Sequence, residues 1–122
     1  MHKCIICIGS NCNREENLSL ARHRLRELFP SIRFTSEQET QPLFFKNPAL
    51  FSNQVAQFFS EATEEMIQEE LKTIEKFAGR LPEDKKKEKV CLDIDLLIFD
   101  NRILRPDEME REYIMKGLEE LK

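Results

Sequence analysis

The sequence contains no long hydrophobic run. Among its 122 residues, 40% are hydrophobic and 34% are charged, and the longest apolar segments lie at residues 4–8 and 92–99. Both are far shorter than the roughly 18 to 20 consecutive apolar residues of a membrane-spanning helix, so we expect no membrane span and no membrane partner. The apolar run near Met1 is too short for a signal peptide and lacks a small-residue cleavage site, so we expect a cytoplasmic protein.

The chain has no excess of positive charge, few glycines and few prolines. Its formal net charge is −4, so it lacks the positive field that holds general nucleic-acid binders to phosphate groups. We therefore expect no nucleic-acid partner. Three glycines, five prolines and the absence of a repeated segment argue against low-complexity and solenoid architectures. The length fits one domain over residues 1–122, and we expect a monomer.

The four cysteines raise the possibility of a zinc or redox site. Cys4 and Cys7 lie on a predicted strand, where residues three apart point to opposite faces, so the two thiols are not expected to share a tetrahedral ion. We expect reduced thiols without a metal, because free cysteine is among the most buried residue types. Cys12, in a predicted loop, is the thiol that we expect to be reactive.

Hydrophobic periodicity predicts alternating strands and helices. The second helix begins at Thr63 as its N-cap, and Asn13 with Glu16 forms a candidate capping pair for the first helix. Residues 40–50 are irregular but carry the adjacent aromatics Phe44 and Phe45, so they form a candidate ligand loop. The predicted strands lie at residues 3–9, 32–39, 51–60 and 90–99, and the helices at 13–29, 63–78 and 107–121.

The order of these elements predicts the fold class. Strands and helices follow one another as β-α-β-β-α-β-α, which is typical of the α+β ferredoxin-like βαββαβ sandwich with one added helix. We expect an antiparallel sheet with helices packed on one face, plus a C-terminal helix.

Two aspartates share one face of the last predicted strand. The opposite, apolar face is formed by Val90, Leu92, Ile94, Leu96 and Ile98. Asp93 and Asp95 therefore lie side by side, and like charges on an otherwise apolar strand are costly unless cations compensate them. Carboxylate oxygens at this spacing suit Mg²⁺. A solvated sheet face with lysine or arginine neighbours is the alternative.

A paired-carboxylate magnesium site indicates phosphoryl-type transfer. Mg²⁺ held by one or two carboxylates completes its coordination with waters and substrate phosphates. The sequence has neither a P-loop nor a Gly-x-Gly-x-x-Gly motif, so phosphates must be held in another way. Five cationic residues at 80–89 directly precede the aspartates and are candidates for that role. A solvated surface loop is the alternative.

Four short motifs follow one another along the chain: Ile8-Gly9-Ser10-Asn11, Phe51-x-Asn53, Ile74-Glu75-x-x-x-Gly79-Arg80 and Leu92-Asp93-Ile94-Asp95-Leu96-Leu97. Their order and spacing resemble the 6-hydroxymethyl-7,8-dihydropterin pyrophosphokinase family over residues 3–118. The resemblance implies transfer of pyrophosphate from MgATP to 6-hydroxymethyl-7,8-dihydropterin, with release of AMP, in folate biosynthesis. It also implies that ATP and a reduced pterin are the ligands, and that Asp93 and Asp95 bind two Mg²⁺ ions.

The resemblance also assigns the remaining site residues by position. Arg80 and Arg111 match basic positions near the phosphates and the substrate, and Glu75 matches an acidic position near the catalytic groove, on the ATP side. Lys87 and Lys89 do not match family residues, and we expect them to bind ATP as cations of the preceding loop. The pterin would be held by Gly9, Thr40, Leu43, Phe51, Asn53 and Tyr113. A flat heteroaromatic ring suits aromatic faces and an asparagine amide in its plane. Core packing is the alternative for the aromatic pair, Phe51 and Tyr113.

The chain departs from the family on the ATP side. Val90 stands where the family commonly has an arginine, and Arg105-Pro106-Asp107 stands where a Pro-His segment is expected. Loop lysines, Arg102 or Arg105 would then replace the missing contacts. The alternative is an impaired member that binds a pterin or nucleotide without transfer. A remote alternative is a ferredoxin-like RNA-binding module, which the Asp93 and Asp95 charges disfavour.

Overall fold

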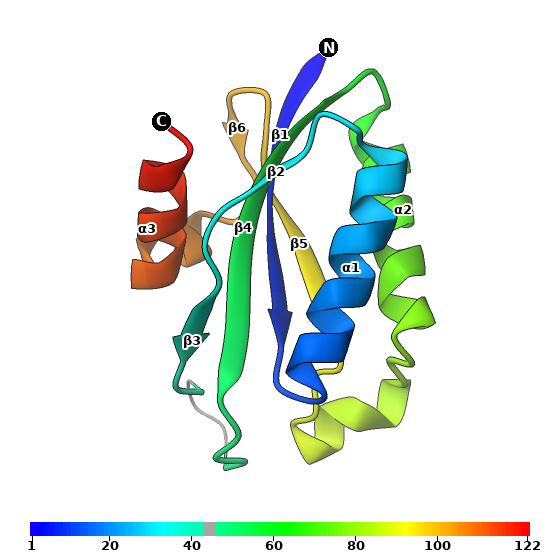
Figure 1. Ribbon diagram of the computed structural model, residues 1–122, viewed down its shortest axis with the longest axis vertical. Helices are drawn as coiled ribbons and strands as arrows, with labels where there is room; N and C mark the ends of the chain where they lie inside the picture. The colour runs from blue at the N-terminus through cyan, green and yellow to red at the C-terminus, as the bar shows by residue number, and fades with distance from the viewer. Residues whose placement is uncertain (43–45) are drawn as a thin grey trace.

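An antiparallel sheet forms the centre of the molecule in the computed structural model, which describes residues 1–42 and 46–122. Its strand order is β2-β4-β1-β5-β6, and β3 also pairs with β4 (Figure 1). The strands are β1 (His2–Ser10), β2 (Arg33–Phe34), β3 (Gln38–Thr40), β4 (Phe51–Ser60), β5 (Asp93–Phe99) and β6 (Arg102–Ile103).

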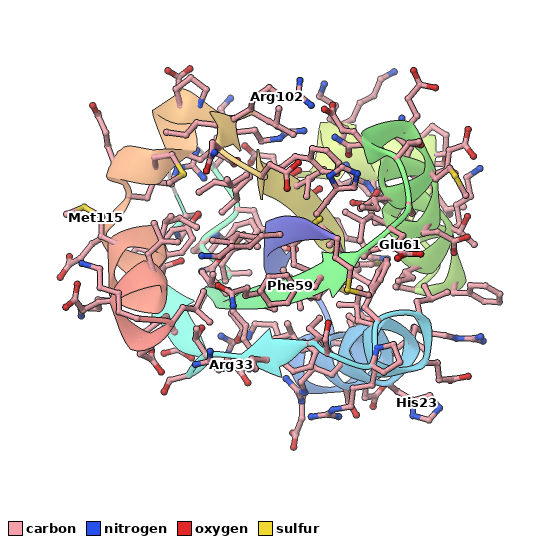
Figure 2. All side chains as sticks on the ribbon, turned by 90° about the horizontal axis from the view of Figure 1, so that it is seen from above. His23, Arg33, Phe59, Glu61, Arg102 and Met115 are labelled. Carbon is pink, nitrogen blue, oxygen red and sulfur yellow. The ribbon has the colours of Figure 1, made fainter. Side chains whose placement is uncertain are left out.

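Helices cover both faces of this sheet. Seen end-on in Figure 2, α1 and α2 pack on one face, while α3 packs on the other, with the sheet between them. The helices are α1 (Arg14–Leu28), α2 (Glu64–Phe77) and α3 (Glu112–Glu120), with 3₁₀ segments η1 (Pro82–Lys87) and η2 (Pro106–Glu110). The predicted α+β fold, with its βαββαβ-like order and C-terminal helix, is confirmed. None of the described helices is long and apolar enough to cross a membrane.

The central strand β1 contributes side chains to two separate hydrophobic cores, one on each face of the sheet. Cys4, Ile6 and Ile8 pack with α1 and α2, whereas Ile5 and Cys7 pack beneath α3. This alternation confirms that Cys4 and Cys7 point to opposite faces, as strand geometry requires. One side of the sheet is therefore a purely structural core, and the other is the floor on which α3 rests.

A bulge in β5 changes which of its side chains share a face. Ile5 of β1 pairs with Ile98 and Ile6 pairs with Leu96, so Leu97 is an extra residue on β5. Leu97 and Ile98 consequently both pack on the α3 side. The prediction that Ile98 shares the face of Ile94 and Leu96 is therefore wrong. The strand also begins at Asp93 rather than at residue 90.

The two predicted helix caps have different outcomes. Thr63 caps α2, because its Oγ1 accepts a hydrogen bond of 3.2 Å from the Met66 amide. Asn13 does not cap α1 with its side chain, so the predicted capping pair with Glu16 is wrong. Its backbone is left-handed at φ 46°, a conformation that asparagine tolerates, and Asn17 Nδ2 instead donates to the Cys12 carbonyl at 2.7 Å.

The single strand predicted over residues 32–39 is divided into β2 and β3. Both pieces pair with β4, but between them Thr35 turns its side chain into the ladder. Its Oγ1 donates to the Val55 carbonyl at 3.0 Å and accepts from the Val55 amide at 3.2 Å. The Thr35 backbone N–H also donates to the Val55 carbonyl at 2.9 Å, so the hydroxyl adds to one backbone hydrogen bond here and takes the Val55 amide that the ladder would otherwise pair.

Asn11 ties the turn after β1 to the segment before β5. The backbone N–H of Asn11 donates to the Val90 carbonyl at 2.9 Å, and the side-chain Oδ1 of Asn11 accepts a hydrogen bond from the backbone N–H of Val90 at 2.6 Å. Its Nδ2 also donates to the Glu88 carbonyl at 2.8 Å. These bonds keep the end of β1 paired with the start of β5, where Gly9 lies opposite Asp93.

Candidate active site

A cavity of about 350 Å³ opens on the α3 side of the sheet. Its walls come from the ends of β1, β3, β4 and β5 together with η2 and α3. Five of the residues assigned to pterin binding line it: Gly9, Thr40, Phe51, Asn53 and Tyr113. The sixth, Leu43, and the aromatics Phe44 and Phe45 lie outside the described residues, so their predicted roles stay predictions.

Asn53 is buried and held at the floor of this cavity. The Nδ2 of Asn53 donates to Thr40 Oγ1 at 2.7 Å, and Asn53 lies opposite Gly9 in the pairing of β4 with β1. A Cβ on Gly9 would lie 3.3 Å from Asn53 Oδ1, which is closer than an ordinary contact. The glycine therefore leaves room for an amide that can pair with the edge of a ring.

Tyr113, one of the two aromatic side chains that line the cavity, is hydrogen-bonded to Arg111. Arg111 NH1 donates to the Tyr113 hydroxyl at 2.9 Å, where η2 passes into α3. Burial is the largest cause that raises the pKa of the Tyr113 hydroxyl, and Arg111 opposes it. Tyr113 thus remains a neutral phenol, while its hydrogen bond holds the Arg111 guanidinium at the cavity wall.

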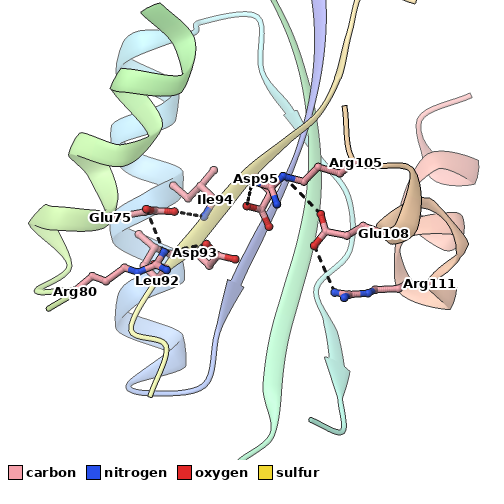
Figure 3. Close-up of polar contacts among 9 residues, drawn as sticks. All are labelled: Glu75, Arg80, Leu92, Asp93, Ile94, Asp95, Arg105, Glu108 and Arg111. Atoms are coloured by element: carbon pink, nitrogen blue, oxygen red, sulfur yellow. Dashed lines mark hydrogen bonds and ion pairs between the residues drawn. The ribbon is translucent and has the colours of Figure 1, made fainter. Parts of the chain in front are cut away.

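Asp93 and Asp95 lie side by side where β5 is an open edge of the sheet. The short strand β6 pairs only with Ile98 and Phe99, so the start of β5 has β1 on one side alone among the described strands. Figure 3 shows the two carboxylates there, with Arg80 on one side and Arg105 on the other. Both aspartates also line the cavity, which confirms that they share a face.

On the α2 side, Arg80 and Glu75 close this edge. Arg80 NH1 donates to Asp93 Oδ1 at 2.9 Å and lies 3.2 Å from Glu75 Oε1. Glu75 Oε2 accepts the Ile94 amide at 2.7 Å, which satisfies a strand N–H that no neighbouring strand takes. Burial, with the Asp93 charge adding to it, raises the pKa of Glu75 to about 7.

On the α3 side, Arg105 NH2 lies 3.4 Å from Asp95 Oδ1. The pKa of Asp95 is nevertheless raised to about 7, first by burial and then by the charges of Asp93 and Glu108. Arg105 lowers the pKa of Asp95 but does not offset these causes. The carboxylate pair thus carries more negative charge than its neighbouring cations compensate.

The donor set fits a magnesium ion. Four carboxylates, from Glu75, Asp93, Asp95 and Glu108, share three guanidinium groups, from Arg80, Arg105 and Arg111. No group of three metal-ligating side chains occurs in the part of the chain that the structure describes. Mg²⁺ does not need one, since one or two carboxylates suffice when waters and phosphates complete its octahedron. Asp93 and Asp95 would hold it.

Some predicted ATP-side residues lie away from the cavity. Lys87 and Lys89 are exposed and do not line it, so their role in ATP binding stays a prediction. Arg102 lies on β6 at the far edge of the sheet, where its NH2 is 2.6 Å from Glu64 Oε1 (Figure 2). Of the two arginines considered as replacements for the missing contacts, Arg105 is the one beside the aspartates.

Sequence reasoning missed several lining residues, among them Cys7 and Glu108. Cys7 could have been found, because strand alternation places it on the same face as Gly9. Glu108 carries no such signal, since it belongs to an irregular 3₁₀ segment that reaches Asp95 only through the fold.

The cavity therefore combines two aromatic side chains and a buried amide with a pair of carboxylates, a set of groups suited to a flat ring next to a cation-bound phosphate chain. Residues 5–122 match the family model described as 7,8-dihydro-6-hydroxymethylpterin-pyrophosphokinase (HPPK), and the chain belongs to that family. No curated protein matches it. The protein is therefore an ATP-dependent diphosphotransferase of folate biosynthesis that uses MgATP and a pterin, which confirms the resemblance found in the sequence.

Proposed function

We propose that this chain transfers pyrophosphate from ATP to 6-hydroxymethyl-7,8-dihydropterin in the cavity described above, acting as a single-domain monomer. The observation that supports it is the continuity of that cavity: one space is lined both by Asn53 and Tyr113 and by Asp93 and Asp95. Two substrates held in fixed positions in one site react without a separate encounter in solution. This positioning supplies a large share of the rate enhancement of such transfers.

The pterin ring is bound between Phe51 and Tyr113, with Asn53 at its edge. Both aromatic side chains line the cavity, and Asn53 is buried and fixed by Thr40. Stacking on two aromatic faces and hydrogen bonding to an amide in the ring plane together orient the hydroxymethyl group. We place that group toward Asp93 and Asp95, because the carboxylate end is the part of the cavity suited to cations and phosphates.

Asp93 and Asp95 are proposed to hold two Mg²⁺ ions, which neutralise and orient the phosphate chain when bound. Arg80 pairs with Asp93 and Arg105 lies beside Asp95, while Arg111 lines the same cavity, and these guanidinium groups supply fixed positive charge where charge develops during transfer. The hydroxymethyl oxygen attacks the β-phosphorus of ATP, and the bond from that phosphorus to the bridging oxygen of the α-phosphate breaks. AMP leaves with that oxygen, and the hydroxyl proton passes to solvent.

The test is AMP release from MgATP with and without the pterin. We expect AMP only when the pterin is present, and Asp95→Asn should reduce the rate by about a hundredfold or more, since metal-mediated charge stabilisation supplies several kcal/mol. Asp107→Asn is the matched control, because Asp107 is exposed and lies outside the cavity lining. Equal rates in the Asp95→Asn variant and the wild type would remove Asp95 from the mechanism.

A second candidate function is pterin or nucleotide binding without transfer. The observation that favours it is the exposure of Lys87 and Lys89 away from the cavity, in a chain with Val90 at a commonly basic position. Calorimetry distinguishes the two candidates. A protein that binds the pterin but no MgATP analogue would be this impaired member, whereas binding of both ligands favours the active enzyme.

A further inference from the structure

Glu108 lies between two guanidinium groups at the wall of the cavity. Its Oε1 is 3.5 Å from Arg111 NH1, and its Oε2 is 4.0 Å from Arg105 Nε. Arg105 reaches on to Asp95, so the charges alternate from Asp95 through Arg105 and Glu108 to Arg111 (Figure 3). All of these links come from η2 and the residues that flank it, except Asp95 on β5.

The Glu108 carboxylate is not satisfied by its surroundings. Its Oε2 is buried, and among the described residues it is the buried side-chain oxygen or nitrogen that has no hydrogen-bond partner. A buried acceptor left unpaired is destabilising, so a role that needs the carboxylate at this position would explain why it is kept there. The Arg105 guanidinium, at 4.0 Å, is the nearest described cation that can move onto this oxygen.

Direct contact of Glu108 with phosphate would be repulsive, since both groups are anionic. The two arginines are different. Their side chains are 50% and 40% exposed, and a long cationic side chain loses rotamer freedom when it is fixed in one position.

We propose that Glu108 is a positioning residue that holds Arg105 and Arg111 toward the phosphate chain of ATP. The inference rests on the proposed function, because the phosphates are placed beside Asp95 by the metal that Asp95 would hold. If Asp95 held a cation, its carboxylate would no longer be free to pair with Arg105 at 3.4 Å, and the unpaired Oε2 of Glu108 would be available to accept a hydrogen bond from Arg105. Arg105 would thereby stay at the cavity wall rather than moving into solvent.

The direction in which nucleotide affinity changes in a Glu108→Gln variant distinguishes a positioning role from simple repulsion between like charges. Glu108→Gln keeps the shape of the side chain and removes its negative charge. A carboxylate that acts only as a like charge would, when removed, strengthen the binding of an anionic nucleotide. A positioning carboxylate would instead weaken it, by roughly five- to tenfold if one charge-assisted contact to an arginine is lost.

The experiment measures the affinity of a non-hydrolysable ATP analogue with Mg²⁺ by calorimetry. We expect Glu108→Gln to bind it roughly five- to tenfold more weakly, while pterin affinity and melting temperature stay close to those of the wild type. Glu110→Gln is the matched control: it removes the same charge from the same 3₁₀ segment, but Glu110 is exposed and outside the cavity lining. It should leave the affinity unchanged or slightly stronger.

A double-mutant cycle tests whether Glu108 acts through Arg105. In an Arg105→Gln background, Glu108→Gln should weaken the binding of the ATP analogue less than it does in the wild type, because one of the two arginines that Glu108 positions is already gone. An affinity that rises in Glu108→Gln, or equal losses in both backgrounds, would overturn the inference. Since binding is measured with an analogue, the comparison decides the inference whether or not the protein releases AMP.

Discussion

Gly117 of α3 lies directly against Val55 of β4. A Cβ placed on Gly117 would lie 2.5 Å from Val55 Cγ2 and 2.6 Å from Val55 Cβ. No side chain other than hydrogen fits at this distance, so the glycine sets how closely α3 approaches the sheet. The same helix begins beside Arg111 and carries Tyr113, so this contact also fixes the height of the cavity wall.

Gly117→Ala is therefore expected to damage both stability and ligand binding. Overpacking should lower the free energy of unfolding by about 1–3 kcal/mol, and displacement of Tyr113 should weaken pterin binding. Urea unfolding and calorimetry measure the two effects. Lys116→Ala, on the exposed side of α3, is the control and should change stability by less than about 0.5 kcal/mol.

Adding Val55→Ala to Gly117→Ala should not restore the protein. The Val55 Cβ itself lies 2.6 Å from the new methyl group, so the backbones must still move apart. A double variant that is as stable as Val55→Ala alone would show that the Val55 methyl groups, and not the approach of the helix, limit the contact.

Gly9→Ala should affect the ligand more than the fold. Its Cβ would press on Asn53 Oδ1 at 3.3 Å, and the amide must give way by a few tenths of an ångström. We expect pterin affinity to fall by about fivefold, because one hydrogen bond contributes about 1 kcal/mol. Ile8→Val is the contrasting control: Ile8 lies in the opposite core, so the change should cost about 0.5–1.5 kcal/mol of stability without altering the affinity.

Thiol labelling should proceed in a fixed order. Burial raises the pKa of Cys4 to about 11, and burial also raises the pKa values of Cys7 and Cys91. Cys12 is only partly buried. Because the thiolate is the reactive form, a thiol reagent at neutral pH should modify Cys12 first in the native protein. Peptide mapping by mass spectrometry checks this, and fast labelling of Cys7 would contradict the predicted burial.

Asp100 should make stability depend on pH in the acid range. Its carboxylate accepts the Lys3 amide at 3.1 Å and contacts His2 Nδ1 at 2.7 Å, and the hydrogen bond with His2 is the main cause that lowers its pKa. A lowered folded-state pKa gives stability that is present above the unfolded pKa of about 3.9 and is lost as the pH falls through the folded value.

Urea unfolding of the wild type and Asp100→Asn at several pH values tests this prediction. Asparagine tolerates the left-handed backbone that Asp100 adopts at φ 55°, so the comparison isolates the charge. The wild type should be the more stable protein near neutral pH, and the two stabilities should converge below about pH 4. A difference that is constant across this range would exclude the Asp100 charge as its source.

Long periodic segments of the fold could be predicted from the sequence. Residues 51–60 form β4 with the expected bounds, and Thr63 caps α2, because both elements follow from strictly local patterns. The prediction for Ile98 is wrong because the bulge depends on how β5 pairs with β1. That pairing cannot be inferred from the sequence of either strand alone. Asn13 was assigned as a side-chain cap because its type favours that role, but its left-handed backbone prevents it.

The candidate site was predictable to a similar extent. Strand alternation was enough to place Asp93 beside Asp95, and both line the cavity. The charged side chains on the α3 side could not be assigned in the same way, because Arg105 and Glu108 reach β5 only through the turn after β6 and the course of η2. A run of lysines at residues 85–87 is more conspicuous in the sequence, yet those side chains are exposed.

The open edge of β5 also has a consequence for self-association. An unpaired strand edge is a template on which a second copy of the chain can add a strand. Here Glu75 accepts the Ile94 amide, and the paired charges of Asp93 and Arg80 lie beside it, so an incoming backbone would meet an N–H that is already hydrogen-bonded and a charged ion pair. The groups that border the two aspartates at this edge therefore also oppose the addition of a strand from a second copy, and neutralising them together should weaken that opposition.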